Sequence, residues 1–544
     1  MDMRKLIKTI LFVVIGLLVL RKAEDILEKK WSYPGDYEEV PKIINEFYSL
    51  KEGSLEAVFL GKSSVKLAVS PIQIYENSSI VTYNLASSAQ PIQLSYYLLK
   101  EVFRKQSPQI IFLDASELFR SSASEDYSWH FIMDNVPMSR NKIEAAVSYT
   151  DEKEGRDFLS MMCPLYYYHD RWDELTRNDF EKQEETDYYY AAGQYMTSLV
   201  SGTGLTYENV NAEVAAMNRQ KGCRKEYTDH IYQQYEMEDK LYEVTMNQEV
   251  IEYIRKMKVI CEEHNAKLVL LKVPTMGMPQ INYISWSQDK YRLVKELCQE
   301  MGVTFFDMVY DTAYEAEIDW QKDTIDGGAH LNIRGAEKVT SCITAYLEEQ
   351  GLEKRIDELY YQCTRDYERV HRICMLQSES DLTEYIRRIL EDENYTIIIS
   401  AQSDFQASLS EDDLDAFMCL GLQSCLTHGV RDSFIGVIDR GEVIYESISN
   451  RKSFYKFILP GGGEMEVTSS GLNTGSYSSI KIDGKEHSTN MQGLNFVIWD
   501  NRTNLVVDSV NFNTSLPGAA AYRNKGVILD YLAKYKHVIN AHKE

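Results

Sequence analysis

The stretch Ala57-Val58-Phe59-Leu60-Gly61-Lys62-Ser63-Ser64 decides how this chain is interpreted. Its first four residues are apolar and indicate a buried strand, and Gly61 can turn sharply where the strand ends. Ser63 would then lie at the carboxyl edge of a sheet, where open α/β folds place their sites. Far downstream, Asp326 and His330 lie close together in the sequence. Serine, histidine and aspartate are the three groups of an acyl-transfer site.

This combination of residue types has a chemical reason. A serine hydroxyl is a poor nucleophile near neutral pH and needs an adjacent base, which in turn needs an orienting acceptor. We expect His330 to be the base for Ser63 and Asp326 to hold its imidazole. Backbone N–H groups at a strand-to-helix turn can stabilise the oxyanion.

Strand and helix patterns alternate over residues 51–350, which predicts an α/β domain with a parallel sheet covered by helices on both faces. Residues 116–246 lack this rhythm and are interpreted as a helical insertion. The expected strands are 57–60, 109–114, 267–273 and 303–306, and the expected helices are 93–104, 248–264, 290–301 and 334–349.

The texture of the sequence changes after a charged helical connector at 351–392. Short strands with Gly/Asp turns predict a mainly β second domain at 393–515. Its expected strands are 395–400, 433–438, 442–448, 478–482 and 494–498. A tail helix near 527–538 is expected within the last segment, 516–544.

Composition excludes several classes of function. The formal charge of −25 argues against nucleic-acid binding, because a phosphate backbone would be repelled. The nine cysteines form no CxxC pair and no Cys/His cluster at zinc spacing, so no metal site is expected. We interpret them as free thiols.

The N-terminus carries the one segment that concerns a membrane. Residues 6–20 are apolar apart from Lys8 and Thr9, and they span about 22 Å as a helix, short for a hydrocarbon core of about 30 Å. We interpret residues 1–22 as an uncleaved signal anchor and 23–50 as a stalk, which would place the remainder outside the cytoplasm. A cleaved signal peptide and a core helix of a cytoplasmic protein are the alternatives.

Three blocks resemble those of the SGNH/GDSL hydrolase superfamily, in the same order: Gly61–Ser63, Tyr83–Pro91 and Asp326–Ala336. They are most similar to its membrane-anchored bacterial branch, whose members acylate teichoic acids and exopolysaccharides. The segment Pro164–Trp172 also resembles a stretch found in that branch. The resemblance covers residues 51–350 and implies a flavodoxin-like parallel sheet.

The resemblance also assigns roles. It implies that Ser63 is the nucleophile, that His330 is the base and that the backbone N–H groups of Ser63 and Ala86 form the oxyanion hole. It implies no metal or nucleotide cofactor. The expected partners are a polysaccharide or glycan acyl acceptor and a membrane-bound acyltransferase of the MBOAT type.

The chain departs from the family pattern at three places. Ala86 stands where glycine is usual, and the oxyanion-hole asparagine is absent, the region taken as equivalent being 272–275. Asp326 lies one residue further from His330 than usual, with Asp323 as a substitute. Two interpretations follow: an active site with a modified oxyanion hole, or an inactive glycan-binding scaffold.

The second domain resembles the interleukin-like EMT inducer (ILEI, or PANDER-like) domain through residues 469–476, 480–486 and 493–500. The order of these blocks implies a circularly permuted β-sandwich. In some relatives this fold binds sugars. The sequence thus predicts a membrane-anchored, extracytoplasmic esterase or O-acyltransferase that acts on acyl groups of a cell-surface polysaccharide.

Overall fold

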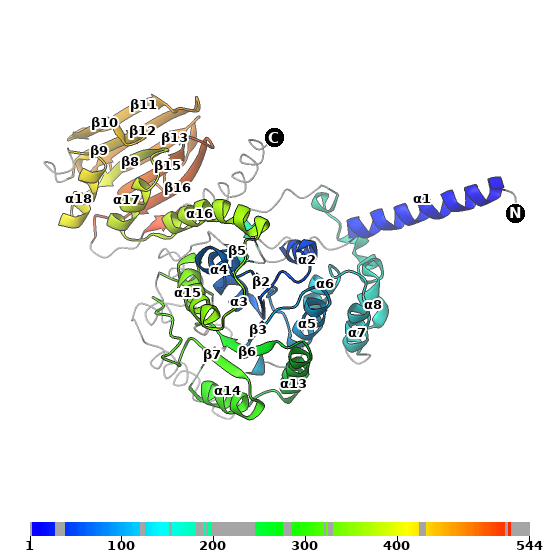
Figure 1. Cartoon of the computed structure of the whole chain (residues 1–544). Helices are drawn as coiled ribbons and strands as arrows, with labels where there is room; N and C mark the ends of the chain where they lie inside the picture. The colour runs from blue at the N-terminus through cyan, green and yellow to red at the C-terminus, as the bar shows by residue number, and fades with distance from the viewer. Residues whose placement is uncertain are drawn as a thin grey trace, which may run out of the picture.

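The computed structural model describes residues 3–27, 39–119, 126–151, 155–180, 189–191, 194–196, 245–275, 286, 288–319, 322–324, 330–423, 431–516 and 521–523. The expected tail helix and Asp326 lie outside this part of the chain. Two folded units, one α/β and one β, are joined by a long helix (Figure 1).

The first unit is built on a five-stranded parallel sheet with the strand order β2-β1-β3-β6-β7. This is the flavodoxin-like order, in which the chain reverses direction beside its first strand. The expected fold class is therefore confirmed. The strands are β1 (Ala57–Leu60), β2 (Thr82–Asn84), β3 (Ile110–Asp114), β6 (Lys267–Lys272) and β7 (Thr304–Asp307).

Helices cover both faces of this sheet because successive residues of β1, β3 and β6 are apolar and point to opposite sides. Val58 and Leu60 of β1 pack toward α2, α5 and α13, whereas Phe59 packs toward α3, α4 and α15. The helices are α2 (Glu39–Ser49), α3 (Ser63–Ala68), α4 (Pro71–Ser78), α5 (Ile92–Lys105), α13 (Gln248–Glu263), α14 (Gln288–Met301) and α15 (Ile333–Glu349).

The segment expected to be a stalk contributes to the core instead. Ile43, Ile44 and Phe47 of α2 are each only 2% exposed, and the hydroxyl of Tyr83 donates to the carbonyl oxygen of Ile43 at 2.8 Å. The charged residues of 23–50 suggested a solvated spacer, but α2 is amphipathic and buries its apolar face. Residues 39–49 therefore belong to the α/β unit.

The described part of the insertion is largely helical, as expected. Its elements are η1 (Ala115–Phe119), α6 (Asp126–Met133), α7 (Arg140–Tyr149), α8 (Phe158–Met162), α9 (Pro164–Tyr167), η2 (His169–Asp173), η3 (Arg177–Asp179), β4 (Tyr189–Ala191) and β5 (Gln194–Met196). The strands β4 and β5 form a two-stranded hairpin that we did not expect.

Helix α16 (Glu358–Ser378), followed by α17 (Leu382–Leu390), connects the two units. The hydroxyl of Tyr360 donates to the carbonyl oxygen of Thr82 in the first unit. The guanidinium of Arg369 binds Asp500 of the second unit at 3.0 Å. Because its buried side chains contact both units, α16 is part of both cores.

The second unit is a β-sandwich flanked by helices. One layer runs β10-β9-β8-β15-β16-β17 and the other β11-β12-β13-β14, and they join where the end of β8 pairs with β12. Its elements are β8 (Tyr395–Ser403), α18 (Glu411–Cys419), β9 (Ser433–Asp439), β10 (Glu442–Ser449), β11 (Ser453–Ile458), β12 (Glu464–Gly471), β13 (Tyr477–Ile482), β14 (Lys485–Glu486), β15 (Gly493–Asp500), β16 (Leu505–Phe512) and β17 (Tyr522–Arg523).

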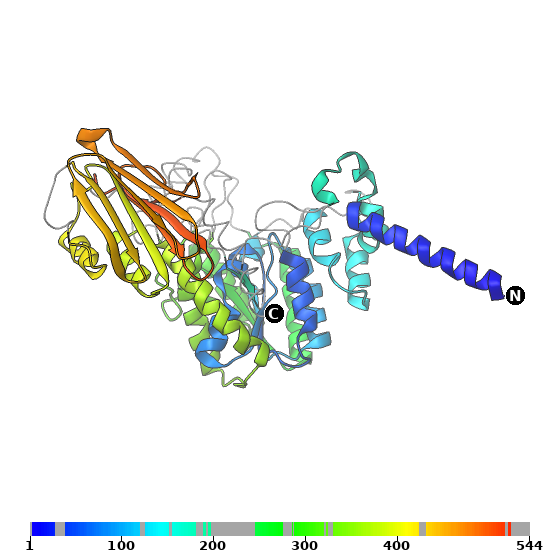
Figure 2. The same ribbon diagram turned by 90° about the horizontal axis from the view of Figure 1, so that it is seen from above.

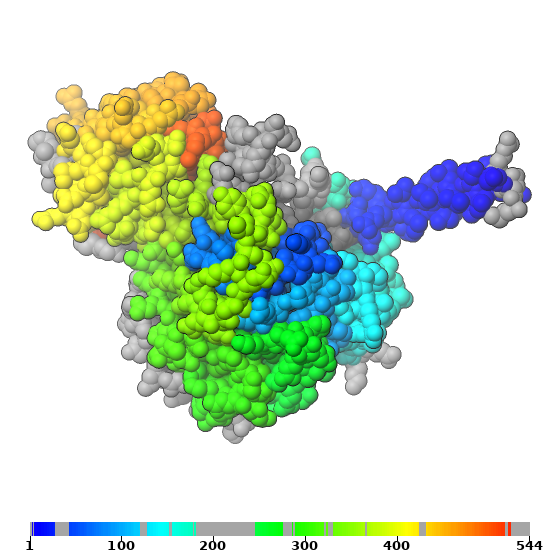
Figure 3. All heavy atoms as spheres, in the orientation of Figure 1, coloured from blue at the N-terminus to red at the C-terminus, as the bar shows by residue number. Residues whose placement is uncertain are grey.

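The N-terminal helix α1 (Met3–Leu27) projects from the body of the molecule, as Figures 2 and 3 show. Its apolar side chains are exposed, from Leu6 at 37% to Phe12 at 78%. Within the described ranges, α1 and every other helix fall short of the length and apolarity that crossing a bilayer requires. The expected membrane-spanning helix is thus not found, because charged residues near both ends shorten the apolar run.

Candidate active site

Ser63 lies where the sequence placed it, at the carboxyl end of β1 and at the first position of α3. Gly61 makes the turn between them with a φ of +154°. A Cβ on Gly61 would lie 2.6 Å from the Cβ of Asp114, so this turn requires glycine.

The structure brings Ser63 and His330 together. The hydroxyl oxygen of Ser63 lies 2.7 Å from Nε2 of His330, although 267 residues separate them in sequence. This is hydrogen-bond distance between a nucleophile and its base. The two predicted residues therefore form a serine–histidine pair at the edge of the sheet.

The loop before α15 fixes the position of His330. Its neighbour Leu331 forms a β-bridge with Thr324, and the N–H of Asn332 donates to the carbonyl oxygen of Asp323 at 3.0 Å. The side chain of Asn332 caps α15 by accepting from the N–H of Arg334 at 2.9 Å. The chain that follows His330 directly is therefore held by backbone pairing and by a helix cap.

Asp326, with Asp323 as its substitute, is the carboxylate expected to orient His330. Asp326 lies outside the described residues, so its assignment as the orienting group stays a prediction. Asp323 is buried, and its carboxylate accepts from Lys338 at 2.6 Å and from the N–H of Asp319 at 2.8 Å. Its carboxylate is thus used in anchoring the loop and α15.

The two expected oxyanion donors, the N–H groups of Ala86 and Ser63, differ in whether they already donate a hydrogen bond. The N–H of Ala86 donates to the side-chain oxygen of Asn84 at 3.0 Å, so it is not available to a substrate while that bond stands. Lys62, the residue before Ser63, provides no side-chain cap for α3. The N–H of Ser63 has no hydrogen-bond partner among the described residues and remains the better candidate.

Asp114, at the end of β3, is a site residue that we did not predict. It accepts a hydrogen bond from the hydroxyl of Ser64 at 3.1 Å and is almost fully buried. Burial alone would raise its pKa, but the positive charges of Lys62 and Lys272 and hydrogen bonds from Ser116 lower it instead. Its place after a strand adjacent to β1 was the signal that could have found it.

Lys62 is a second residue whose role the sequence did not reveal. Its ammonium lies 2.8 Å from the carboxylate of Glu117, and both side chains are at most 10% exposed. The pair joins the turn before Ser63 to η1. Lys62 therefore takes part in positioning the turn.

The region 272–275, taken from the sequence as equivalent to the oxyanion-hole block, is separated from the Ser63 turn by one strand. It follows β6, and β3 separates β6 from β1. The ammonium of Lys272 donates to the carbonyl oxygen of Val273 at 2.6 Å and to the hydroxyl of Thr275 at 2.8 Å. The residues that follow β3, rather than these, border the Ser63 turn.

We expect Gly61→Ala to destabilise the protein by about 2–4 kcal/mol, because the methyl group would strain φ and overlap Asp114. Urea unfolding measures this change. Gly53→Ala is the matched control, because Gly53 also has a positive φ of +66° but its nearest neighbour would be 3.5 Å away. It should cost only about 1 kcal/mol; equal costs for the two variants would contradict the overlap.

Lys290, at the start of α14, carries a charge that burial disfavours. Burial and the nearby positive charge of Lys272 lower the pKa of Lys290 to about 8. The unfolded chain then binds more protons than the folded one above pH 8, so this group makes stability rise as the pH increases toward 10.5.

Lys290→Met should therefore increase the free energy of unfolding at pH 7 by about 1–2 kcal/mol, after allowance for partial exposure. The gain should vanish above pH 10.5. Unfolding measured at pH 7, 8, 9 and 10 tests both statements. Lys295→Met, at an exposed position on the same helix, is the control and should bring no such gain; a gain from Lys290→Met that is independent of pH would contradict the assignment.

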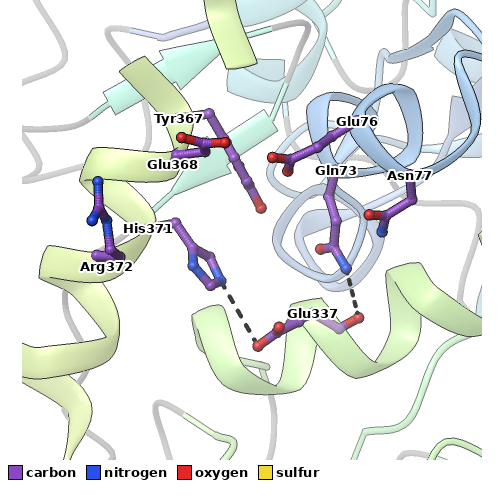
Figure 4. A pocket seen from close by; sticks show the side chains of 8 residues that line it. All are labelled: Gln73, Glu76, Asn77, Glu337, Tyr367, Glu368, His371 and Arg372. Atoms are coloured by element: carbon purple, nitrogen blue, oxygen red, sulfur yellow. Dashed lines mark hydrogen bonds and ion pairs between the residues drawn. The ribbon is translucent and has the colours of Figure 1, made fainter. Parts of the chain in front are cut away.

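A hollow of about 380 Å³ lies between α4, α15 and α16 (Figure 4). Burial and a hydrogen bond with Glu368 raise the pKa of Glu76. The imidazole of His371, whose Nε2 lies 3.7 Å from the carboxylate of Glu337, lowers the pKa of Glu337. Gln73 donates to the carbonyl oxygen of Glu337 at 3.1 Å. These groups pair with one another across the three helices, so we assign them a structural role.

Comparisons with known proteins add little. No family model and no curated protein matches the chain. Among solved structures, it is similar to a GDSL-like lipase from Bacteroides thetaiotaomicron, with 10% identity over 58% of this chain and 100% of that one and a TM-score of 0.26. A provisionally assigned acylhydrolase from Bacteroides fragilis is similar at 11% identity over 59% of this chain and 99% of that one, also with a TM-score of 0.26. Similarity this weak does not support a functional assignment, so the fold and the site are assigned from the strand order and from the geometry around Ser63.

Proposed function

We propose that this chain is a serine esterase or O-acyltransferase in which Ser63 is the nucleophile and His330 the general base. The observation that carries the proposal is the 2.7 Å contact between the Ser63 hydroxyl and Nε2 of His330. The Ser63–His330 pair lies at the carboxyl edge of a parallel sheet, which is where open α/β folds bind ligands.

The chemistry follows from these two groups. The Ser63 oxygen bonds to the acyl carbonyl carbon while its proton passes to Nε2 of His330. The tetrahedral intermediate then expels the alcohol, which takes that proton, and leaves an acyl group on Ser63. Water or an acceptor hydroxyl attacks this ester, with His330 again as base, and frees Ser63. The N–H of Ser63 would stabilise the oxyanion, and Asp326 would orient His330.

The substrate and the location are proposed from the sequence blocks around these residues. Their resemblance to proteins that acylate cell-wall polymers supports acyl groups of a cell-surface polysaccharide as the substrate. The exposed apolar side chains of α1 support attachment to a membrane. Insertion of residues 1–22 as a signal anchor would place the body outside the cytoplasm. The β-sandwich would then present the glycan, and an MBOAT-type acyltransferase would supply the acyl group.

A fluorophosphonate probe tests the nucleophile directly, because it reacts with activated serines. The wild-type protein should be labelled at Ser63, as mass spectrometry of the digest would show. Ser63→Ala should abolish labelling, and Ser64→Ala, next to it on α3, should leave it largely intact. Labelling that survives in Ser63→Ala would place the nucleophile elsewhere.

The second candidate function is a non-catalytic glycan-binding scaffold. The hydrogen bond between the N–H of Ala86 and Asn84 favours it, because one expected oxyanion donor is occupied. Under this alternative, no variant is labelled and no acetyl ester is cleaved, while wild type and Ser63→Ala bind polysaccharide with equal affinity.

A further inference from the structure

Five large apolar side chains are exposed along residues 158–180, which contain α8, α9, η2 and η3. They define what we call the platform. Their exposed fractions are 36% for Phe158, 57% for Leu159, 48% for Tyr166, 71% for Trp172 and 63% for Phe180. Soluble proteins seldom expose a group of this kind without a partner.

Helix α1 leaves the body of the molecule beside α9 and η2, which carry Tyr166 and Trp172 of the platform. Helix α1 contacts α9 and η2, and a guanidinium nitrogen of Arg171 donates to the carbonyl oxygen of Leu27, the last residue of α1. The same guanidinium binds Asp179 of η3 at 3.0 Å. A surface that takes up α1 is therefore close to the part of the platform on α9 and η2.

Tyr167 and Tyr168, next to Tyr166 of the platform, are packed against the body of the protein. Tyr168 is 4% exposed, and the ring of Tyr167 stacks on His130 with centroids 3.5 Å apart. Tyr166, by contrast, lies half-exposed against His169, with ring centroids 5.9 Å apart. Within this run, Tyr167 and Tyr168 pack inward, and Tyr166 is left facing outward.

We propose that the platform rests on a lipid bilayer and inserts its aromatic side chains at the level of the headgroups. This inference rests on the membrane attachment through α1 under the proposed function, and adds a second, separate contact. Trp and Tyr are the residues enriched at this depth, because one part of each ring is apolar and another is polar.

The charges on the platform indicate how it would bind. Trp172 lies between Arg171 and Asp173, and Asp170 and Glu174 are close in sequence, so the residues next to Trp172 carry more negative than positive charge. Binding would therefore rely on apolar insertion, helped by the high local concentration that attachment of α1 provides. We expect it to depend little on salt or on anionic lipid.

Two native thiols allow this to be tested in the full-length protein. Cys163, between α8 and α9, is exposed in the platform, and Cys419, at the end of α18, is exposed in the second unit. The other exposed or half-buried cysteines are replaced by serine. Two proteins are then prepared, one that keeps Cys163 and one that keeps Cys419, and each is labelled with the fluorophore NBD. Vesicles of phosphatidylcholine with a nitroxide-labelled acyl chain then report lipid contact, and iodide reports contact with water.

We expect the lipid nitroxide to quench NBD on Cys163 at least about 3-fold more than NBD on Cys419, with the opposite order for iodide. The triple variant Leu159→Asp/Trp172→Asp/Phe180→Asp should remove this difference. It should still float with the vesicles, because α1 is unchanged, and the three replaced side chains are exposed, so folding should not suffer.

Each of the remaining outcomes contradicts the platform contact, and one of them also contradicts the attachment through α1. If wild type does not float, both the attachment through α1 and the platform contact are refuted. Flotation with Cys163 open to iodide refutes the platform alone. Protection of Cys163 from iodide without lipid quenching also refutes it, and shows that protein covers this face. None of these results bears on labelling of Ser63, which tests the catalytic proposal separately.

Discussion

Replacing His330 by glutamine is expected to lower the rate of ester cleavage by about 1,000-fold or more. Glutamine can still hydrogen-bond to the Ser63 hydroxyl, which lies 2.7 Å from the imidazole, but it cannot accept its proton. The nucleophile would then attack as a neutral hydroxyl. Initial rates with p-nitrophenyl acetate on the purified protein measure the effect.

The control for this experiment is a histidine with no place in the proposed mechanism. His169 is exposed, and its Nδ1 lies 2.6 Å from the carbonyl oxygen of Tyr166. His169→Gln should leave the rate unchanged. Wild-type rates in the His330 variant, with Ser63→Ala inactive, would show that another group activates the serine.

The largest effect on stability is expected from Arg523→Leu, at about 3–5 kcal/mol. Arg523 and Asp508 form an ion pair at 3.1 Å, and both side chains are 0% exposed. Arg523 also donates to the carbonyl oxygen of Glu379, and the hydroxyl of Tyr385 donates to Asp508 at 3.0 Å. Removing the guanidinium would leave a carboxylate buried without its counter-charge. The urea midpoint of unfolding measures the loss.

Two further variants decide whether the cost comes from the unpaired charge. Arg387→Leu removes an arginine from the exposed pair with Glu384 and should cost less than about 1 kcal/mol. The double variant Arg523→Leu/Asp508→Leu should be less destabilised than Arg523→Leu alone, because no buried charge remains. Additive costs of the two substitutions would argue against this explanation.

The elements that the sequence predicted are those with a single dominant pattern. The strand Ile110–Asp114 and the helices Ile92–Lys105 and Gln248–Glu263 lie within two residues of their predicted bounds. Each buries an uninterrupted apolar run or one apolar helical face, which local periodicity reveals. All five strands predicted for the second unit are present as well.

The element Leu505–Phe512 was missed because its pattern depends on partners that are distant in sequence. Asp508, Ser509 and Asn511 interrupt the apolar run, yet all three are buried. Tyr385 and Arg523 bind Asp508, and the hydroxyl of Ser509 donates to the carbonyl oxygen of His487. Polar residues can occupy a covered strand only when such partners exist.

The sequence by itself predicted four of the five strands of the parallel sheet, the turn at Gly61 and the pairing of Ser63 with His330, because these follow from local pattern and recognisable blocks. Only the tertiary structure decided what surrounds them: that Asn84 occupies the N–H of Ala86, that Asp114 accepts from Ser64 and that Glu117 pairs with Lys62. A hydrogen bond or ion pair depends on where two side chains lie in space, and spacing along the chain does not specify that position.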